Sequence, residues 1–441
     1  MKKEYTRIEI ERIVEENKRL KIENKSMQKI LGSKRFRAAE KIANIVNEVL
    51  PAGSIRRKAV VSIKVPVRFC RCRKMKAKVR KIERMIQKYD KIIVMHSIPW
   101  NTPLRQRPHH LARCLSEQGA MIIYLEPDEP IKNLRVVKEG FVTVNSWEII
   151  LQLKLDQKKD YYFFFNNVSN IPFSMIRKIK DYGYSLVYEY IDEFHEDISG
   201  SLVNQLETWK RLKTDKPKLV LASADKLYEE AKKHFKGVDV LLSKNAVVLE
   251  DFDFHRFQDV EAPSDLAEVM KNKKPVVGYY GALAPWLDYK LISKTAIDNP
   301  NYNFVLIGVN YQNALERLDR TLKNIYYLGP KKYTDLSKYS SKFDCAIIPF
   351  GLGEIAKGTS PVKLFEYMAM GLPTVGTRDL KECKGYEYVY LAKNENDFSE
   401  KIKLAISEGK KKDVKEKLCA QAEKNTWMKR AEDIMAELQQ V

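Results

Sequence analysis

The sequence predicts an α/β protein with two doubly wound parallel sheets behind a basic, helical N-terminal extension. Short apolar runs alternate with helix-like segments twice, first from Lys91 and again from Pro275, a pattern typical of parallel sheets covered by helices. At 441 residues the chain is long enough for two such domains plus an appendage. We expect the extension over 1–88, the two domains over 89–262 and 263–424, and a terminal helix over 425–441.

The extension carries most of the net charge. The chain has a net charge of +21, and residues 1–88 hold 27 Lys and Arg against 9 Asp and Glu. Residues 89–441 hold 52 basic against 49 acidic residues, which is close to balance. The strong basicity is therefore a property of the extension rather than of the two domains.

Two helices are expected within the first fifty residues. Residues 5–31 carry apolar side chains at heptad spacing, interrupted by Asn17 and Asn24, which predicts a short coiled-coil seam. A parallel homodimer through residues 5–31 is one interpretation, and a single exposed or docked helix is the other. A second amphipathic helix is expected over 36–50, where Pro51 and Gly53 would end it.

Residues 54–88 mix positive charge with bulky apolar side chains. They hold 14 Lys and Arg and one acidic residue among valines, isoleucines and a phenylalanine. This composition favours an anionic membrane surface as the partner, where each Lys or Arg contributes about 1 kcal/mol. A plain solvated helix is the alternative. Nucleic acid is not expected as a partner, because no nucleic-acid-binding fold accompanies the charge.

The sequence also predicts the compartment. It shows no secretory signal and no uninterrupted run of eighteen apolar residues. Six scattered cysteines do not form a disulfide framework, and Cys70 and Cys72 lack the second pair of ligands that a zinc site needs. We therefore expect no metal site, and a cytoplasmic protein that is peripheral at the inner face of the cell membrane.

The first domain offers two candidate catalytic residues. Asp192 follows an expected strand at 186–191, where a carboxylate can face a ligand and act as a general base or orient a hydroxyl group. His109 begins an expected helix, which is another position that faces ligands in open sheets. The alternatives are a solvated acidic loop for Asp192 and a surface or capping role for His109.

The second domain contains the segment that we place at the centre of function, residues 358–377. Ser360 is a favourable N-cap residue and Pro361 suits the first helical position, so a helix should start there. The free N–H groups of Val362 and Lys363, the positive end of the helix dipole and the Lys363 ammonium would then converge on one point. That point suits a phosphate group.

Glu366 lies one helical turn beyond Lys363 on the same face, where its carboxylate could accept hydrogen bonds from two neighbouring hydroxyl groups. A nucleoside diphosphate carries such a pair on its ribose. The alternative is an ordinary capped helix whose apolar face packs into a core.

The string S-P-V-K-L-F-E-Y-M-A-M-G-L-P-T-V resembles the donor-binding signature of bacterial glycosyltransferases with the two-domain, Rossmann-like GT-B fold, related to the retaining group 1 family. In the first domain, residues 107–112 match the R-P-x-x-L-A pattern of the acceptor domain of these enzymes. The usual signature carries a glutamate separated from the helix glutamate by seven residues, and this chain has Gly358 at that position.

The resemblance implies that a nucleoside-diphosphate sugar is the co-substrate and that neither a cofactor nor a metal is needed. It implies a hexosyltransferase-like, retaining transfer to a glycan or lipid-linked glycan in cell-surface polysaccharide biosynthesis. Gly281, in the first strand-to-helix loop of the second domain, would correspond to the glycine that lets the backbone approach the donor's phosphates. Residues 329–333 would correspond to the edge that holds the base, and the helix over 425–441 to the one that crosses back to the first domain. Inversion through Asp192 or a histidine is the mechanistic alternative. A nucleotide-sugar epimerase of the same fold and a non-catalytic scaffold of a polysaccharide assembly complex are the functional alternatives.

Overall fold

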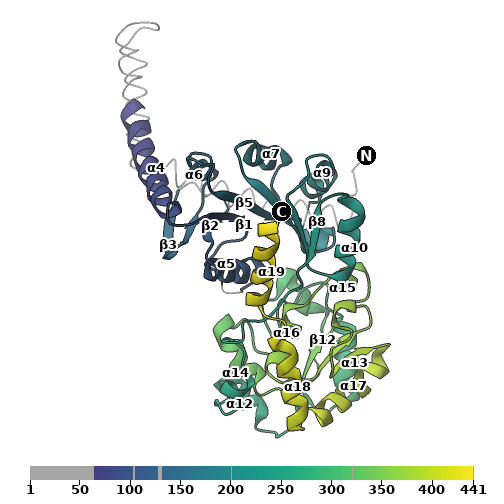
Figure 1. Cartoon of the computed structure of the whole chain (residues 1–441). Helices are drawn as coiled ribbons and strands as arrows, with labels where there is room; N and C mark the ends of the chain where they lie inside the picture. Colours follow the sequence, from purple (N-terminus) through teal and green to yellow (C-terminus); the bar gives the residue numbers. More distant parts are fainter. Residues whose placement is uncertain (1–63, 103–104, 128–131, 200, 320, 441) are drawn as a thin grey trace, which may run out of the picture. The chain divides into compact units, whose positions relative to one another are not determined.

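The structure, a computed structural model, describes residues 64–102, 105–127, 132–199, 201–319 and 321–440 (Figure 1). The chain divides into two units, residues 1–77 and 78–441, and both sheets belong to the second unit. The helices expected within 5–31 and 36–50, and with them the possible homodimer contact, lie outside the described residues.

The first sheet has eight strands in the order β3-β4-β2-β1-β5-β6-β7-β8. Strand β3 pairs antiparallel to β4, and the other neighbouring strands pair in parallel. The order reverses between β1 and β5, as expected for a doubly wound sheet. The strands are β1 (Lys91–His96), β2 (Met121–Leu125), β3 (Leu134–Lys138), β4 (Phe141–Val144), β5 (Asp160–Asn166), β6 (Ser185–Tyr190), β7 (Leu219–Ala222) and β8 (Asp239–Leu242).

Helices join these strands, because parallel neighbours require a crossover connection. They are α5 (Arg107–Glu117), α6 (Trp147–Ile150), α7 (Phe173–Asp181), α8 (Glu196–Ser199), α9 (Val203–Arg211), α10 (Asp225–His234) and α11 (Phe254–Phe257). Most strand residues are buried, since the helices cover the sheet.

The second sheet has six parallel strands in the order β11-β10-β9-β12-β13-β14, with the reversal between β9 and β12. Its strands are β9 (Val276–Tyr280), β10 (Asn303–Ile307), β11 (Ile325–Tyr327), β12 (Cys345–Ile348), β13 (Thr374–Thr377) and β14 (Val389–Ala392). Its helices are α12 (Ser264–Met270), α13 (Tyr289–Asp298), α14 (Leu336–Ser340), α15 (Glu354–Lys357), α16 (Val362–Ala369), α17 (Glu395–Glu408) and α18 (Lys412–Glu423), with short 3₁₀ helices η1 (Tyr311–Arg317), η2 (Tyr333–Asp335) and η3 (Lys381–Cys383).

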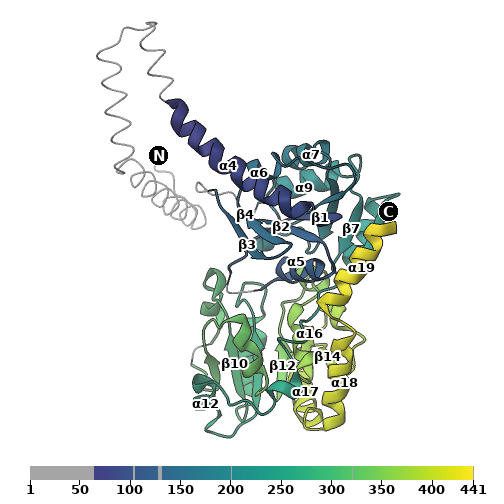
Figure 2. The ribbon, with the colours of Figure 1, turned by 60° about the vertical axis from the view of Figure 1, so that its left-hand side comes forward.

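The last helix, α19 (Trp427–Gln440), packs against the first sheet, whereas α18 packs against α16 of the second (Figure 2). Trp427, Ile434 and Leu438 are buried in one cluster with Leu111 and Leu115 of α5. The Tyr162 hydroxyl of β5 also donates to the Leu438 carbonyl at 3.1 Å. The end of the chain therefore contributes to the core beneath the first sheet.

Helix α4 (Lys64–Ile86) corrects part of the membrane-surface expectation. The side chains of Val79, Ile82 and Ile86 are 6%, 0% and 1% exposed, so they are buried against protein and cannot face lipid. Their spacing of three and four residues forms one helical stripe, which suits a protein core as well as a membrane. The Glu83 carboxylate also accepts a hydrogen bond from the Lys154 N–H at 3.1 Å.

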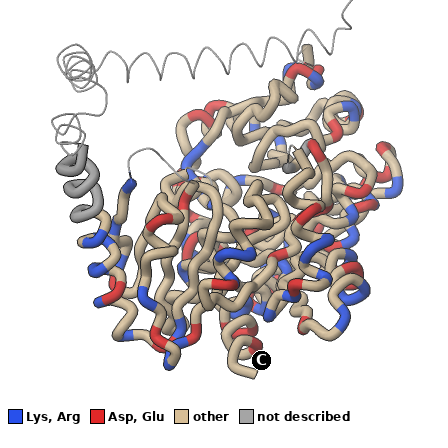
Figure 3. The backbone as a smooth tube through the Cα atoms, turned by 90° about the horizontal axis from the view of Figure 1, so that it is seen from above, with Lys and Arg blue, Asp and Glu red and all other residues tan. Residues whose placement is uncertain are grey.

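Charges of both signs are interspersed along the described backbone (Figure 3). Within the described ranges, no helix combines the length and apolar character that a membrane crossing needs. The same residues contain no group of three or more histidine, cysteine or acidic side chains arranged to hold a metal ion.

Candidate active site

The strand order of the second sheet reverses between β9 and β12. Ligands of open α/β sheets bind outside the carboxyl ends of the strands at such a reversal, because the loops there separate in opposite directions. The loop after β9 begins with Gly281, and the loop after β12 leads through Phe350 and Gly358 to the start of α16. The segment that the sequence singled out therefore lies at the reversal.

Gly281 and Lys363 lie against each other at this point. A Cβ atom at Gly281 would lie 2.9 Å from Lys363 Cε and 3.3 Å from its Nζ. The Lys363 ammonium also lies over the rings of Tyr279, at 5.4 Å, and Phe350, at 5.3 Å. Burial lowers the pKa of Lys363 to about 8. A cation held among aromatic rings beside bare backbone has a strong need for an anionic partner.

Gly308, which was not among the predicted site residues, keeps the Gly281 loop in place. Its φ is +148°, and a Cβ atom there would lie 1.7 Å from the Gly281 carbonyl oxygen. The Gly281 N–H donates to the Ile307 carbonyl at 2.9 Å. The available signal was a glycine directly after the apolar run that forms β10, because glycine in that place allows a close backbone approach.

The start of α16 differs from the expectation. Pro361 occupies the N-cap position and Val362 is the first helical residue, so Ser360 does not cap the helix with its side chain. Ser360 instead meets Asn245, whose N–H donates to Ser360 Oγ at 3.3 Å and whose amide donates to the Ser360 carbonyl at 2.5 Å. Val362 packs against the core cluster of the first sheet. Contacts from the first sheet therefore position this helix terminus.

Arg107 connects the same point to the interior of the first sheet. Its guanidinium donates to Glu189 at 2.9 Å, to the Ser243 carbonyl at 2.7 Å and to Asn245 Oδ1 at 3.4 Å. The Arg107 and Glu189 side chains are 5% and 4% exposed, so each charge depends on the other for compensation. Arg107 was predicted only through its motif, and Glu189 was not predicted because it lies within a strand.

Glu366 lies in α16, three residues after Lys363, and is 4% exposed. Burial raises the pKa of Glu366 to about 7, while the Tyr280 hydroxyl, the Lys363 ammonium and the Tyr333 hydroxyl act in the opposite direction. The two phenols are near enough to affect this pKa, yet neither hydroxyl has a hydrogen-bond partner of good geometry among the described residues. Buried polar groups without partners mark a place where a polar ligand or water is needed.

Asp192 follows β6 and is partly exposed. Burial raises the pKa of Asp192 to about 7, opposed by the Arg107 guanidinium and supported by Glu193. Asn167 fixes its backbone, because the amide donates to the Asp192 carbonyl at 2.6 Å and its oxygen accepts from the Ile191 N–H at 2.8 Å. A carboxyl group that titrates near neutrality can accept a proton from a substrate hydroxyl.

The contacts of His109 do not support the catalytic expectation. Its Nδ1 accepts from the Gln106 N–H at 3.1 Å, and its Nε2 lies 3.2 Å from the Pro99 carbonyl, to which it donates in the same tautomer. The ring is 2% exposed and stacks on Tyr124. Both ring nitrogens are therefore engaged, and burial lowers the pKa of His109, so this histidine holds the loop before α5.

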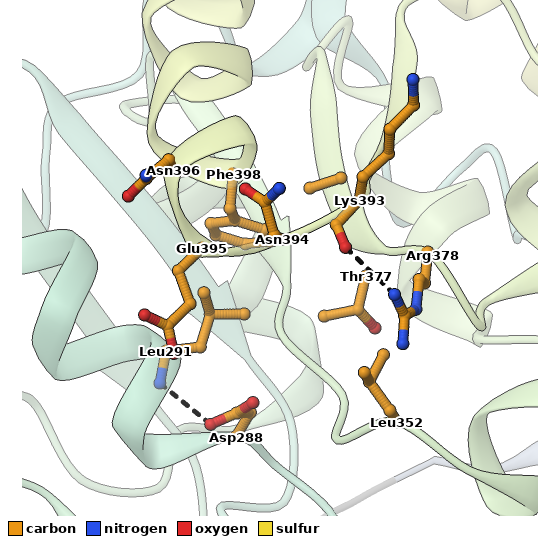
Figure 4. Close-up of a pocket in the computed structure, with 11 residues that line it drawn as sticks. Asp288, Leu291, Leu352, Thr377, Arg378, Lys393, Asn394, Glu395, Asn396 and Phe398 are labelled. Atoms are coloured by element: carbon orange, nitrogen blue, oxygen red, sulfur yellow. Dashed lines mark hydrogen bonds between the residues drawn. The ribbon is translucent and has the colours of Figure 1, made fainter.

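A cavity of about 410 Å³ lies to one side of the strand reversal, outside the carboxyl ends of β13 and β14 (Figure 4). Its polar lining largely serves the local backbone: Asp288 accepts from the Leu291 N–H at 2.9 Å, and Arg378 donates to the Lys393 carbonyl at 3.4 Å. It contains none of the residues around Gly281 and Lys363. We therefore place the candidate site at the reversal and not in this cavity.

Parts of this chain are similar to known proteins. Residues 265–408 match the family Glycosyl transferases group 1, and this range includes the second sheet from β9 to β14. The "Putative teichuronic acid biosynthesis glycosyltransferase TuaH" of Bacillus subtilis (strain 168) is 26% identical over 216 residues, 47% of this chain and 54% of that protein. The chain thus matches about half the length of this relative.

Solved structures resemble most of the chain. Alpha,alpha-trehalose 6-phosphate synthase from Burkholderia multivorans has a TM-score of 0.59 at 10% identity, covering 80% of this chain and 98% of that one. Sucrose-phosphate synthase from Thermosynechococcus elongatus has a TM-score of 0.56 at 13% identity, covering 79% and 98%. Anabaena HepE, in complex with UDP-glucose, has a TM-score of 0.54 at 14% identity, covering 79% and 100%. The GT-B fold expected from the sequence is confirmed.

Proposed function

We propose that this protein is a glycosyltransferase of cell-surface polysaccharide biosynthesis, which moves a sugar from a nucleoside-diphosphate sugar to a glycan or lipid-linked glycan. The observation that carries the proposal is the position of Lys363 over Gly281, at the strand reversal and at the start of α16. The group 1 match over residues 265–408 supports this class of reaction.

The donor's diphosphate binds at residues 360–363 in this proposal. The first N–H groups of α16 and the Lys363 ammonium provide the positive charge, and Gly281 leaves room for phosphate oxygens. Glu366, one turn further along α16, accepts hydrogen bonds from the ribose hydroxyls. HepE, which has the same fold, was solved with UDP-glucose, and this supports a nucleoside-diphosphate sugar as the ligand.

In the transfer step, the bond between the sugar's anomeric carbon and the diphosphate oxygen breaks, and a bond from that carbon to the acceptor oxygen forms. The leaving diphosphate gains negative charge, which Lys363 and the α16 N-terminus stabilise without a divalent metal. We propose that the anomeric configuration is retained and that a donor phosphate oxygen receives the acceptor's proton while Asp192 orients the acceptor hydroxyl. In the inverting alternative, Asp192 itself receives the proton.

We also propose that the protein works at the inner face of the cell membrane. Residues 54–77 hold nine Lys and Arg and no acidic residue, and they precede the buried stripe of α4. Attraction of about 1 kcal/mol per basic residue to an anionic surface would hold the enzyme near a lipid-linked acceptor. This role belongs to 54–77, because the apolar side chains of 79–86 are used inside the protein.

The test begins with a thermal-shift screen of the full chain against UDP, GDP, ADP and CDP, since a ligand that binds only the folded state raises the melting temperature. The matching nucleotide sugar is then incubated with lipid-linked glycan acceptors, and released nucleoside diphosphate is measured with and without EDTA. We expect release that depends on the acceptor and survives EDTA. Loss of activity in EDTA that magnesium or manganese restores would contradict the metal-independent mechanism.

The same assay separates the alternatives. An epimerase would convert the nucleotide sugar into its isomer without an acceptor, and a scaffold would bind neither. Product analysis by NMR reports the anomeric configuration of the new linkage, which distinguishes retention from inversion.

A further inference from the structure

Position 358 has room for a glycine only, because a neighbouring side chain occupies the space that a Cβ atom would need. It has φ −97° and ψ 2°, which residues with side chains also adopt, so the backbone does not require glycine there. A Cβ atom at Gly358 would lie 2.6 Å from both Cγ and Oε1 of Glu193. The volume that a side chain at position 358 would occupy is therefore filled by a carboxylate from the other sheet.

Glu193 is held firmly in this position. It follows β6 of the first sheet and forms an ion pair with Lys226 of α10, which also pairs with Glu354 of α15 at 2.6 Å. The Glu193 side chain is 14% exposed, which leaves it partly open to solvent, whereas that of Glu354 is 59% exposed. Lys226 thus fixes a carboxylate from the first sheet against the loop that leads into α16.

Gly358 is the first residue of the segment 358–377, the candidate donor-binding segment. Its position there indicates which part of the donor the Glu193 carboxylate would contact. Gly358 precedes Ser360 by two residues, and Glu366 follows the proposed phosphate-binding residues 360–363 along the chain. A nucleoside-diphosphate sugar places its ribose at one end of the diphosphate and its transferred sugar at the other. With the ribose at Glu366, the transferred sugar extends toward Gly358 and Glu193.

We propose that Glu193 supplies, from the first sheet, the carboxylate that the donor segment lacks at Gly358, and that it recognises hydroxyl groups of the transferred sugar. This inference rests on the proposed function. The signature that this segment resembles carries a glutamate where this chain has Gly358, and here Glu193, which follows β6, fills the same volume. A carboxylate accepts hydrogen bonds from sugar hydroxyls, and the ion pair with Lys226 orients it. Recognition of the sugar then needs both sheets.

The first experiment compares Glu193→Gln with Glu354→Gln in the full chain. Both substitutions remove a carboxylate from Lys226, but only Glu193 faces Gly358. By isothermal calorimetry, we expect Glu193→Gln to weaken UDP-glucose binding about tenfold or more, the usual effect of losing a charge-assisted hydrogen bond. UDP binding, which involves no sugar, should stay within about twofold. Glu354→Gln should change neither affinity.

The second experiment moves the carboxylate back. Gly358→Glu alone should weaken UDP-glucose binding, because its side chain collides with Glu193. In the double variant Glu193→Gly with Gly358→Glu, the collision is gone and a carboxylate is again present, so binding of UDP-glucose should recover to within about threefold of the original. Melting temperatures of all variants show whether each one is folded.

Three results would overturn the inference. Equal losses of UDP and UDP-glucose in Glu193→Gln would show a structural contact only, and equal behaviour of Glu193→Gln and Glu354→Gln would show that Lys226 pairing is what matters. A folded double variant without recovery would show that a carboxylate in this volume does not recognise the sugar. If the unmodified protein binds no nucleoside diphosphate at all, the proposed donor site fails and the inference fails with it.

Discussion

Lys363 lies directly over Gly281, so that a Cβ atom on the glycine would lie 2.9 Å from Lys363 Cε. The two residues come from different loops, one after β9 and one at the start of α16, which meet where the strand order reverses. Lys363 can occupy this position only because Gly281 has no side chain. The same absence leaves the Gly281 backbone accessible to the ligand that Lys363 would bind. The pair therefore acts as one unit.

Gly281→Ala should weaken nucleoside diphosphate binding strongly. The new methyl group displaces the end of Lys363, and the φ of +141° is strained for any residue with a side chain. Gly385→Ala is the matched control, because Gly385 also has a positive φ, +96°, but no atom within 4 Å of its added Cβ. We expect similar losses of melting temperature in both variants and a loss of affinity, by calorimetry, only in Gly281→Ala. Unchanged affinity in a folded Gly281→Ala would exclude this contact from the site.

Nucleotide affinity should depend on pH with a maximum between about 7 and 8. Burial raises the pKa of Glu366 to about 7, so its carboxylate is lost as the pH falls below that value. Burial lowers the pKa of Lys363 to about 8, so its ammonium is lost as the pH rises above that value. Binding needs both charged forms, and calorimetry across pH 5.5–9.5 would record the two limbs.

Two variants show which ionisable group causes each limb of the pH profile. Glu366→Gln should weaken binding about tenfold or more at neutral pH and flatten the acid limb, because the amide does not titrate. Lys363→Met should flatten the alkaline limb and harm binding of the nucleoside diphosphate more than that of the bare nucleoside. A nucleotide sugar is the better ligand for the acid limb, since it lacks the terminal phosphate ionisation of the free diphosphate. An acid limb that persists in Glu366→Gln would assign it to another group.

Asp192→Asn should lower the turnover number by roughly 10²-fold or more and leave nucleoside diphosphate binding unchanged, the usual pattern for a group that orients the acceptor hydroxyl or accepts its proton. The backbone at this position should persist, because Asn167 holds it through main-chain atoms. Asp181→Asn, at the end of α7 with a side chain that is 69% exposed, is the control. Equal turnover numbers for Asp192→Asn and the control would show that Asp192 does not act on the acceptor hydroxyl.

Residues that interact within one loop or helix were predictable from the sequence, and residues fixed by distant partners were not. The helix at 362–369 follows from local spacing and is present. The contact between Gly281 and Lys363 joins two loops that are far apart in the chain, so spacing alone did not reveal it. Ser360 does not cap that helix, because Asn245, 115 positions away, holds it instead. His109 lies in the first turn of α5, yet the Gln106 N–H and the Pro99 carbonyl engage both ring nitrogens.

The same limit explains the pairing of Gly358 with Glu193, and of Arg107 with Glu189. Each pair joins elements far apart in the chain, and a single sequence carries no signal for such contacts. The stripe of Val79, Ile82 and Ile86 shows a different ambiguity. Basic residues around an apolar helical face suit a membrane or a protein core equally well, and only the contacts decide between them.

Removal of residues 1–77 should therefore leave the rest of the protein folded, whereas removal of residues 1–88 should destabilise it. A protein shortened to begin at Lys78 keeps the buried stripe of α4, whereas one that begins at Tyr89 loses Val79, Ile82 and Ile86. Full burial of each such side chain contributes about 1.5–3 kcal/mol, so the second truncation should unfold at a clearly lower temperature or aggregate. The first should keep the melting temperature and nucleotide binding of the full chain.

The truncation at Lys78 also tests the membrane role. The full chain should sediment with phosphatidylglycerol vesicles at low salt and be released as salt screens its charges, because exposed attractions fade beyond about 8 Å at physiological ionic strength. The protein that begins at Lys78 lacks the nine basic residues of 54–77 and should remain in solution while transferring poorly to a lipid-linked acceptor. Equal sedimentation of the two proteins would show that residues 54–77 do not make the membrane contact. Tight RNA binding by the full chain without vesicle binding would show that nucleic acid, and not a membrane, is the partner.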